Sequence, residues 1–487
     1  MDAMVADLAR AAASSALSWE RARLASSFQG VSHGSRIGSV AKVHRAGHAL
    51  RQRIVATCHR EAFGPGSKPS SAWSAAKWKE KAECPLFLPR PQHPSRDTNT
   101  DRMISEWDFA MKQLVVLLLC GCAGPMLAAE PAALRFQHVL LDEKPPQNPW
   151  IKIVGDLNAD DKLDVVIGGS KGPLVWYRNP DWKKSVIADG GYNTVAGAAV
   201  DIDNDGDPDI ALGGVVWFEN PGSKSDPSKG PWAAHDIEKR RGHDLLAADL
   251  DGDGRVDLVM RDQSSFGSRT GHSIFLYQQI SPDKWTPREL RCGEGEGVAV
   301  ADLNADGRPD IVIGGSWFEN SGDLLKGPWT EHVFSIEWNY PHTKVAIGDL
   351  NGDGRPDIIL APAELKGGTH RIAWYEAPAD ATAGNWKQHI VEEPVETVIH
   401  ALAAADFDGD AQLDLAAAHM HQGKSPQEVV VYLNAGKGLQ WKRQVIATTG
   451  SHDIVAADVN GDGRPDLLGA NHGGPFQPVE LWLNRGE

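Results

Sequence analysis

The sequence predicts an all-β fold built from internal repeats, and three observations support this. A nine-residue acidic pattern, D-x-[D/N]-x-D-x-x-x-D, recurs seven times between Asp156 and Asp466, each time between two apolar strand-like runs. The copies begin 45 to 57 residues apart, which is the length of one four-stranded propeller blade. The last repeat lacks an outer strand, and an orphan strand-like segment at 134–141 precedes the first copy. The chain is therefore expected to form a seven-bladed β-propeller whose N-terminal strand closes the last blade.

Each predicted blade contributes four strands in a fixed order. The first strand precedes the acidic pattern and the second follows it, as at 298–300 and 311–313 around the fourth copy. The third strand carries one or more aromatic residues. The fourth strands begin at Trp182, Trp232, Trp285, Trp329, Trp386 and Trp441. Because these aromatic side chains recur in every blade, we expect them to pack between blades rather than to stack on a ligand.

The acidic pattern itself predicts a metal-binding hairpin turn. Side chains at positions 1, 3 and 5 of a tight turn converge, and the carboxylate at position 9 closes a shell of hard oxygen ligands suited to Ca²⁺. Position 6 requires a positive φ, which glycine supplies in five copies. Asp161 and Ala411 occupy that position in the first and sixth copies, so these two loops are expected to bind calcium more weakly. The alternative is a set of metal-free acidic turns.

The predicted ligands define up to seven calcium sites. They are Asp156, Asn158, Asp160 and Asp164; Asp201, Asp203, Asp205 and Asp209; Asp249, Asp251, Asp253 and Asp257; Asp302, Asn304, Asp306 and Asp310; Asp349, Asn351, Asp353 and Asp357; Asp406, Asp408, Asp410 and Asp414; Asp458, Asn460, Asp462 and Asp466. The loops lack the position-12 glutamate and the flanking helices of an EF-hand.

Repeats such as V-A-I-G-D-L-N-G-D-G-R-P-D-I at 345–358 resemble the FG-GAP/VCBS repeat family. The resemblance covers residues 134–487 and implies a calcium-bearing β-propeller. The segments W-F-E-N-P at 217–221 and W-T-E-H at 329–332 are also similar to the propellers of aldos-2-ulose dehydratases and some ulvan lyases. This second likeness implies a lyase or dehydratase acting on carbohydrate, although the chain lacks the cupin-like domains of the dehydratases.

An export signal is expected inside the chain. Met111 and Lys112 precede an apolar run at 114–120 and a small-residue stretch ending at Ala129, a pattern typical of a signal peptide and too short to span a bilayer. We therefore predict that translation starts at Met111, that residues 1–110 are a disordered extension outside the translated protein, that 111–129 is the signal peptide and that 130–487 is the propeller. The protein is expected in the periplasm, on the cell surface or outside the cell. The sequence around Cys122 also resembles a lipobox, so a lipid anchor there is the alternative to cleavage after Ala129.

Composition narrows the classes of partner. The chain carries 65 Asp plus Glu against 49 Lys plus Arg, a net charge of −16, and no basic patch stands out to neutralise phosphates, which argues against nucleic acid. After signal cleavage Cys292 alone of the five cysteines remains, so calcium rather than disulfides is expected to stabilise the domain. Nucleophile-elbow, Walker, Rossmann and Cys-x-x-Cys motifs do not stand out, which argues against hydrolase, kinase and dehydrogenase functions. We expect a monomer that binds carbohydrate.

Histidines point to a functional face. His243, His342, His400 and His452 lie six or seven residues before their acidic loops, where four inner strands start. In a propeller these starts share the top face with the turns after the second strands, which hold His272, His370, His419, His421 and His472. A histidine at a strand start can instead anchor the preceding turn. The four remaining propeller histidines, on outer strands, are expected to be structural.

We predict catalytic roles for His243, His342, His400, His452 and Tyr340, and substrate binding by Arg261, Lys366, Arg371, His419, His421 and His472. In a β-elimination, a histidine would remove the proton next to a carboxylate or keto group. A cation, or Zn²⁺ held by the top-face histidines, would stabilise the enolate, and Tyr340 or a second histidine would assist the leaving group. The alternative function is a non-catalytic adhesion or protein-interaction propeller, similar to integrin-type FG-GAP modules. Convergence of the top-face histidines would favour the enzyme.

Overall fold

The computed structural model describes residues 133–240, 242–262 and 271–487. All of them belong to the second of two compact units, Pro125–Glu487. The predicted N-terminal extension, the signal peptide and Cys122 lie outside the described residues. Within the described ranges, no helix has the length and apolar character needed to cross a membrane.

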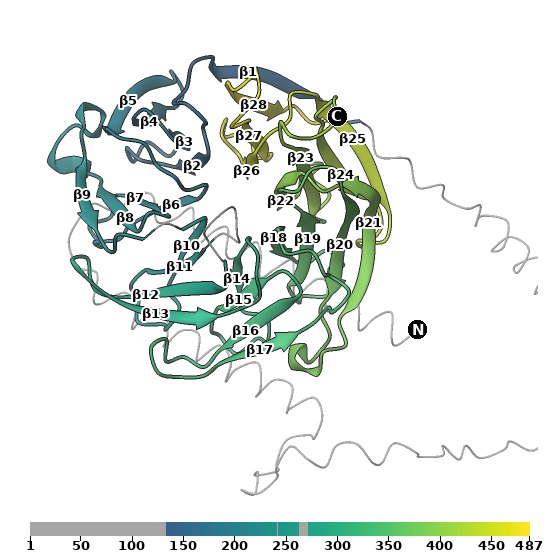
Figure 1. Ribbon diagram of the computed structural model, residues 1–487. Coiled ribbons are helices and arrows are strands. Elements are labelled where there is room, and N and C mark those ends of the chain that lie inside the picture. Colours follow the sequence, from purple (N-terminus) through teal and green to yellow (C-terminus); the bar gives the residue numbers. More distant parts are fainter. Residues whose placement is uncertain (1–132, 241, 263–270) are drawn as a thin grey trace, which may run out of the picture. The chain divides into compact units, whose positions relative to one another are not determined.

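Across the described residues, 28 strands form seven four-stranded antiparallel sheets set in a ring (Figure 1). Each sheet is one blade, and six blades run from the inner strand to the outer strand in chain order. The first three blades are β2 (Ile151–Gly155), β3 (Asp164–Gly168), β4 (Leu174–Arg178) and β5 (Lys183–Ala188); β6 (Gly197–Val200), β7 (Asp209–Leu212), β8 (Val216–Glu219) and β9 (Ala233–Asp236); β10 (Asp244–Ala248), β11 (Asp257–Arg261), β12 (Ser273–Ser281) and β13 (Lys284–Arg291).

The next three blades follow the same plan. They are β14 (Ala299–Ala301), β15 (Asp310–Ile313), β16 (Ser316–Asn320) and β17 (Trp329–Val333); β18 (Thr343–Gly348), β19 (Asp357–Pro362), β20 (Thr369–Glu376) and β21 (Lys387–Glu396); β22 (Ile399–Ala405), β23 (Asp414–His419), β24 (Val429–Asn434) and β25 (Trp441–Ala447). Short 3₁₀ turns occur at η2 (Gly222–Lys224), η3 (Pro227–Lys229) and η4 (Ala381–Ala383). The predicted strand order is confirmed. The tryptophan expected where each fourth strand begins is the first residue of β17 and β25, the second residue of β13, and the residue directly before β5, β9 and β21.

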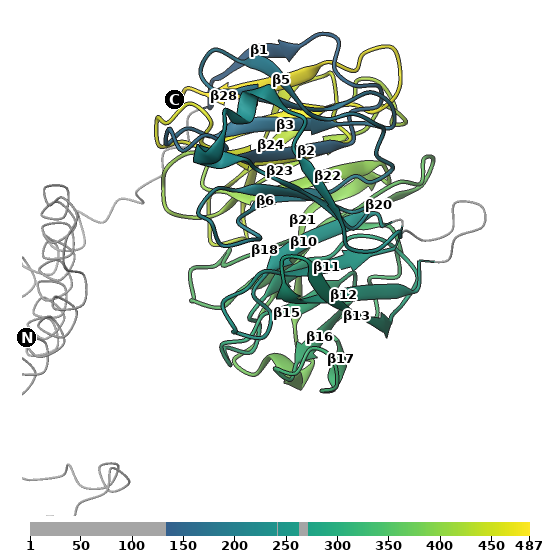
Figure 2. The same ribbon diagram turned by 90° about the vertical axis from the view of Figure 1, so that its left-hand side faces the viewer.

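The seventh blade closes the ring with strands from both ends of the domain. It combines β26 (Asp453–Ala457), β27 (Asp466–Ala470) and β28 (Val479–Asn484) with β1 (Phe136–Asp142). Strand β1 pairs antiparallel with β28, placing Phe136 opposite Asn484 and Val139 opposite Leu481. The inner strands β2, β6, β10, β14, β18, β22 and β26 contact one another in succession around the centre, and β26 contacts β2. Figure 2 shows β2, β6 and β10 following one another in the ring. The predicted closing strand is therefore confirmed.

Large aromatic residues fill the space between blades. Trp217, Trp317 and Trp374 are each about 1% exposed or less. Each stacks on an outer-strand histidine, with ring centroids 4.2 to 4.4 Å apart; the partners are His235, His332 and His389. Those histidines also bond to Glu219, Glu319 and Glu376. The tryptophans and the outer-strand histidines are packing residues, as expected.

The acidic loops occupy the opposite end of the inner strands and tie three strands together. The position-9 carboxylate of Asp257 is fully buried. Its two oxygens accept the backbone N–H groups of Leu250, in the loop, at 3.1 Å and Gln279, at the end of the third strand, at 2.9 Å. Gly254, at position 6, has φ of 83°, and Ala411 adopts nearly the same left-handed conformation at 69°. Because a Cβ is disfavoured there, Ala411 carries backbone strain; the weaker calcium binding expected of its loop stays a prediction.

Candidate active site

The four histidines expected at the top face lie where inner strands begin. His243 and His452 immediately precede β10 and β26, His342 immediately precedes β18, and His400 is the second residue of β22. Since the inner strands lie side by side around the centre of the ring (Figure 1), their starts come together on one face. The rings of His400 and His452 stack at 4.1 Å, and those of His243 and His400 meet at 5.6 Å. All four histidines are buried. The sequence-based expectation of a histidine-rich face is therefore matched by convergent side chains.

Two glutamates complete the centre of this site. His243, Glu296, Glu364 and His400, which we call the carboxylate–imidazole cluster, each offer one ligand-type atom, and these atoms lie within 4.8 Å of one another. Glu296 Oε2 is 3.6 Å from His243 Nε2, and Glu296 Oε1 is 3.6 Å from His400 Nε2. Glu364 Oε1 is 3.0 Å from His400 Nε2. The four residues come from four consecutive blades, the third to the sixth.

Neighbouring groups fix how the two imidazoles face. His243 Nδ1 is 3.2 Å from Asp244 Oδ2, and His400 Nδ1 donates to the backbone carbonyl of His452 at 2.7 Å. Both histidines therefore turn Nε2 toward the carboxylates of the cluster. Glu364 holds its place on the β19–β20 turn with φ of 73°. A non-glycine residue in this region is uncommon, and such strain concentrates at functional sites.

The carboxylate–imidazole cluster is strongly charged. Burial by itself would raise the pKa of Glu296, but the neighbouring His243, His342 and His400 hold it well below its usual value. Burial opposes protonation of His400, yet its hydrogen bonds to Glu296 and Glu364 raise its pKa to about 10. Imidazolium groups thus help to balance the carboxylates of the cluster.

A second group of histidines next to this cluster is neutral. His452, His472 and His421 form a row with ring centroids 4.2 and 4.5 Å apart. Burial, followed by repulsion from neighbouring histidines, lowers the pKa of His472 to about 3 and that of His452 well below its usual value. Burial also lowers the pKa of the half-buried His421. Their Nδ1 atoms have no hydrogen-bond partner within the described part of the chain. We call these three residues the neutral histidines.

Charged side chains also lie on the inner strands that carry the histidines. Lys344 lies 3.5 Å from Asp453. Lys152 is 7% exposed and donates to the backbone carbonyls of Pro149 and Trp150. Burial lowers the pKa of Lys152 to about 8. The inner strands therefore contribute lysine and aspartate side chains as well as histidines.

The remaining predicted residues lie around the site in different roles. Arg261 is buried and donates to the backbone carbonyls of Glu296 and Gly297, at 2.7 Å each, so it braces the segment that carries Glu296. The ring of Tyr340 lies near those of His342 and His370, with ring centroids 6.4 and 5.5 Å apart. Arg371 donates to the carbonyl of Glu337 and lies over Trp338. Lys366 is exposed and His419 is half-buried. The carboxylate–imidazole cluster therefore includes none of Lys366, Arg371 and His419.

Sequence reasoning missed Glu296 and Glu364. Glu296 lies six residues before the fourth acidic loop, which is the register of His243, His400 and His452 before theirs. Reading every blade at that position would have found it. Glu364 lies in a turn whose length differs between blades, and no repeat position marks it.

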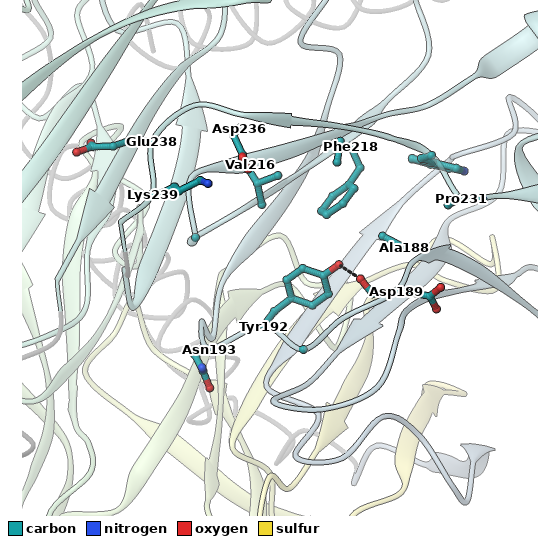
Figure 3. Close-up of a pocket in the computed structure, with 14 residues that line it drawn as sticks. Ala188, Asp189, Tyr192, Asn193, Val216, Phe218, Pro231, Asp236, Glu238 and Lys239 are labelled. Carbon is teal, nitrogen blue, oxygen red and sulfur yellow. Dashed lines mark hydrogen bonds between the residues drawn. The ribbon is translucent and has the colours of Figure 1, made fainter.

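Among the described residues, one pocket lies beside the histidines and another lies between two blades. One of about 350 Å³ is lined by Arg261, Trp338 and Tyr340 together with Glu294 and Glu331, so it adjoins the site. The other, of about 620 Å³, lies between the first and second blades (Figure 3). There the Tyr192 side chain lies close to Phe218, and its hydroxyl donates to the carbonyl of Asp189 at 3.3 Å. An aromatic surface rimmed by carboxylates can stack on and hydrogen-bond a sugar ring.

The acidic loops gather oxygen atoms as the pattern predicted, with one difference. In the second, third and sixth loops the carboxylates at positions 1, 3 and 9 lie within 4.8 Å of one another; these are Asp201, Asp203 and Asp209; Asp249, Asp251 and Asp257; Asp406, Asp408 and Asp414. The position-5 carboxylates instead pair with a basic residue at position 7 in several loops, as Asp253 does with Arg255 and Asp462 with Arg464. The aspartate side chain at position 5 would have to rotate away from its basic partner to become a ligand of a metal ion in the loop.

The FG-GAP-like repeat family matches residues 156–212, 249–313, 349–417 and 406–469. With its seven blades, the chain belongs to the FG-GAP repeat β-propellers. No curated protein sequence matches it. The likeness to aldos-2-ulose dehydratases and ulvan lyases stays a prediction.

Similar solved structures include three at low identity. A chain of "BBS1N in complex with ARL6DN" is 13% identical, with 71% of this chain and 95% of that chain covered and a TM-score of 0.46. "YCF48 bound to D1 peptide" is 12% identical, with 74% and 99% covered and a TM-score of 0.41. A chain of the "Mitotic Checkpoint Complex" is 11% identical, with 75% and 96% covered and a TM-score of 0.45.

Proposed function

We propose that this protein is an exported, calcium-stabilised enzyme of the carbon–oxygen lyase type that acts on carbohydrate. Its active site would be the face where the inner strands begin. The observation that carries the proposal is the convergence of imidazoles and carboxylates from four blades on one buried point. Burying so many ionisable groups costs folding free energy. A ring that served only as scaffold would gain nothing from that cost, whereas acid–base chemistry needs such groups close together.

The two histidine groups suit the two halves of a β-elimination. A base must be neutral and reachable, and His421 meets both conditions because it is half-buried and its pKa is lowered by burial. The carboxylate–imidazole cluster holds positive charge next to the substrate, on the His400 imidazolium or on a cation that displaces its proton, and this charge can stabilise the enolate that forms when the proton leaves. Tyr340 keeps its proton because burial raises its pKa, so it can protonate the departing oxygen.

Calcium fits the acidic loops by the chemistry of their donors. Carboxylate and amide oxygens are hard ligands, and three loops already gather three carboxylates each. Burial raises the pKa of the position-9 residues Asp209 and Asp257 to about 7. A bound cation would favour their ionised forms and relieve repulsion within each loop. The residues that would hold it are those at positions 1, 3 and 9, joined by position 5 after it leaves its basic partner.

A substrate screen tests the enzyme proposal. The purified protein, supplied with Ca²⁺ and Zn²⁺, is incubated with uronic-acid polysaccharides and with keto-sugars, and the ultraviolet absorbance of the new conjugated double bond is followed. We expect a substrate among the uronates or keto-sugars, and a loss of about 100-fold or more in kcat for His421→Ala and His400→Ala.

His272→Ala is the matched control, because His272 lies before β12 and, among the described residues, takes no part in the ring contacts of the site. Its activity should equal that of the wild type. If none of the substrates gives an unsaturated product, the lyase proposal fails and the non-catalytic adhesion propeller becomes the better description.

A further inference from the structure

We propose that His243, Glu296, Glu364 and His400 form a binding site for one divalent transition-metal ion of the zinc type, separate from the acidic loops. The inference goes beyond the proposed function, because the site would exist whether or not the protein is an enzyme.

The distances between the ligand-type atoms are those of an ion's coordination shell. A tetrahedral zinc ion with bonds of about 2.0 to 2.1 Å holds its ligand atoms roughly 3.3 Å from one another. Here Glu296 Oε2 is 3.6 Å from His243 Nε2, Glu296 Oε1 is 3.6 Å from His400 Nε2, and Glu364 Oε1 is 3.0 Å from His400 Nε2. All four atoms lie within 4.8 Å of one another. Little movement is needed to place an ion between them.

The groups behind the cluster have the arrangement that metal-binding histidines require. Such a histidine donates its other ring N–H to a carboxylate or a backbone carbonyl, which fixes the ring and its tautomer. His243 uses Nδ1 toward Asp244, and His400 uses Nδ1 toward the carbonyl of His452. Both Nε2 atoms are thereby presented to the same point. Arg261, which holds the carbonyls of Glu296 and Gly297, fixes the third ligand in the same way.

Charge and burial agree with a divalent ion. Two carboxylates balance the double positive charge of the ion, so the loaded site would be neutral in surroundings that exclude water. Glu296 and His400 have an exposure of 0%, and an isolated pair of charges at such a depth is costly. The Glu364 side chain is 11% exposed, which leaves an entry route past the β19–β20 turn.

The donor set distinguishes this site from the loops. Imidazole nitrogen favours zinc, copper, iron or nickel, whereas the loops offer only oxygen and favour calcium. The two sites should therefore fill independently. One equivalent of zinc should bind the cluster and resist a large excess of Ca²⁺.

Metal content and competition test the proposal on the full chain. The protein is stripped with a chelator, dialysed against millimolar Ca²⁺, titrated with Zn²⁺ in competition with a chromophoric chelator, and then measured by mass spectrometry for bound metal. Wild-type protein should hold one zinc per chain. Glu296→Gln and Glu364→Gln should each weaken zinc binding by about 100-fold or more, since removing even a supporting group costs about 10- to 100-fold.

Glu319→Gln is the matched control, because Glu319 of β16 forms a comparable carboxylate–histidine contact with His332 of the outer strand β17, at 2.9 Å, and does not belong to the cluster. It should keep full zinc affinity. Glu364 lies on a turn and is partly exposed, so its variant should fold even if Glu296→Gln does not, and circular dichroism checks both. Cobalt provides a second readout: the visible absorption of a tetrahedral Co²⁺ complex should appear in the wild type and vanish in Glu364→Gln.

Two results would overturn the inference: zinc that Ca²⁺ displaces, or zinc retained at full affinity by both glutamate variants. The proposed function fails separately. Zinc bound without any lyase product refutes the enzyme alone, and lyase activity in protein that cannot hold zinc refutes the metal site alone.

Discussion

Individual histidines in this protein are set apart by their neighbours rather than by their position in the repeat. His400 and His452 stack at 4.1 Å and start adjacent inner strands, yet one is held charged and the other neutral. The difference arises because, of these two histidines, His400 is the one that contacts Glu296 and Glu364. The sequence predicts which face the histidines share, since that depends on repeat register. It does not predict their protonation, since that depends on glutamates brought in from other blades.

The pH dependence of stability should reveal the neutral histidines. Burial holds the pKa of His472 at about 3, below the value of about 6.5 in an unfolded chain. The unfolded state therefore binds more protons between these values, and stability is lost as pH falls from about 6.5 toward 3. We expect the melting temperature of the wild type to fall more steeply between pH 7 and pH 5 than that of His472→Gln. Parallel slopes would show that His472 is not buried as a neutral group.

Neighbouring blades are linked by a side-chain contact between a third strand and an acidic loop, which the sequence did not suggest. The residue that ends the third strand of most blades is Asn or Gln, and its side-chain amide reaches the acidic loop of the preceding blade. Asn320 donates to the carbonyl of Leu250 at 2.7 Å, and Gln279 donates to that of Ile202 at 2.8 Å. In the fifth blade Ala377 stands at this place. The strands, loops and aromatic packing were predictable because they follow from patterns inside one repeat, whereas this contact joins two repeats.

Replacing the linking amide should therefore destabilise the ring. Asn320 is fully buried, and Asn320→Ala would leave the Leu250 and Pro309 carbonyls without their partner. We expect a loss of about 2 to 4 kcal/mol in the free energy of unfolding, measured by denaturant titration. Asn385→Ala, at an exposed site, should change it by less than about 0.5 kcal/mol. If both variants changed the free energy of unfolding equally, the Asn320 side chain would not link the blades.

The sixth acidic loop should be improved by glycine. Ala411 has φ of 69°, a conformation that costs an L-residue about 1 to 2 kcal/mol. Glycine avoids this cost, but its greater freedom in the unfolded chain offsets part of the gain in stability. Ala411→Gly should raise the free energy of unfolding by about 0.5 to 1 kcal/mol and tighten calcium binding at that loop. Gln412→Gly, one residue along and outside this conformation, should lower stability. Thermal melts with and without Ca²⁺ would check both.

At the scale of the whole molecule, stability should depend on calcium. Each site that binds only the folded state adds about 2.7 kcal/mol when the ion is present at 100 times its Kd. Chelation should lower the melting temperature markedly, and Ca²⁺ but not Mg²⁺ should restore it, because Mg²⁺ keeps its water shell more tightly. If the chelator left the melting temperature unchanged, the acidic loops would be metal-free turns.

Ring closure should also be required. Val139 of β1 lies opposite Leu481 of β28, and Val139→Pro removes a backbone N–H from the middle of the strand, which should weaken its pairing with β28. The exposed edge of β28 should then promote association, seen as larger species by light scattering. Leu140→Lys on the same strand, at a side chain already 44% exposed, should leave the protein a monomer.

The pairing of β1 with β28 also brings the two ends of the domain together, since Arg135 donates from its backbone to the carbonyl of Gly486 at 2.8 Å. A short peptide could therefore join them. New ends could then be opened at an exposed turn in another blade, and a gene permuted in this way should still encode the same circle of blades with its site intact.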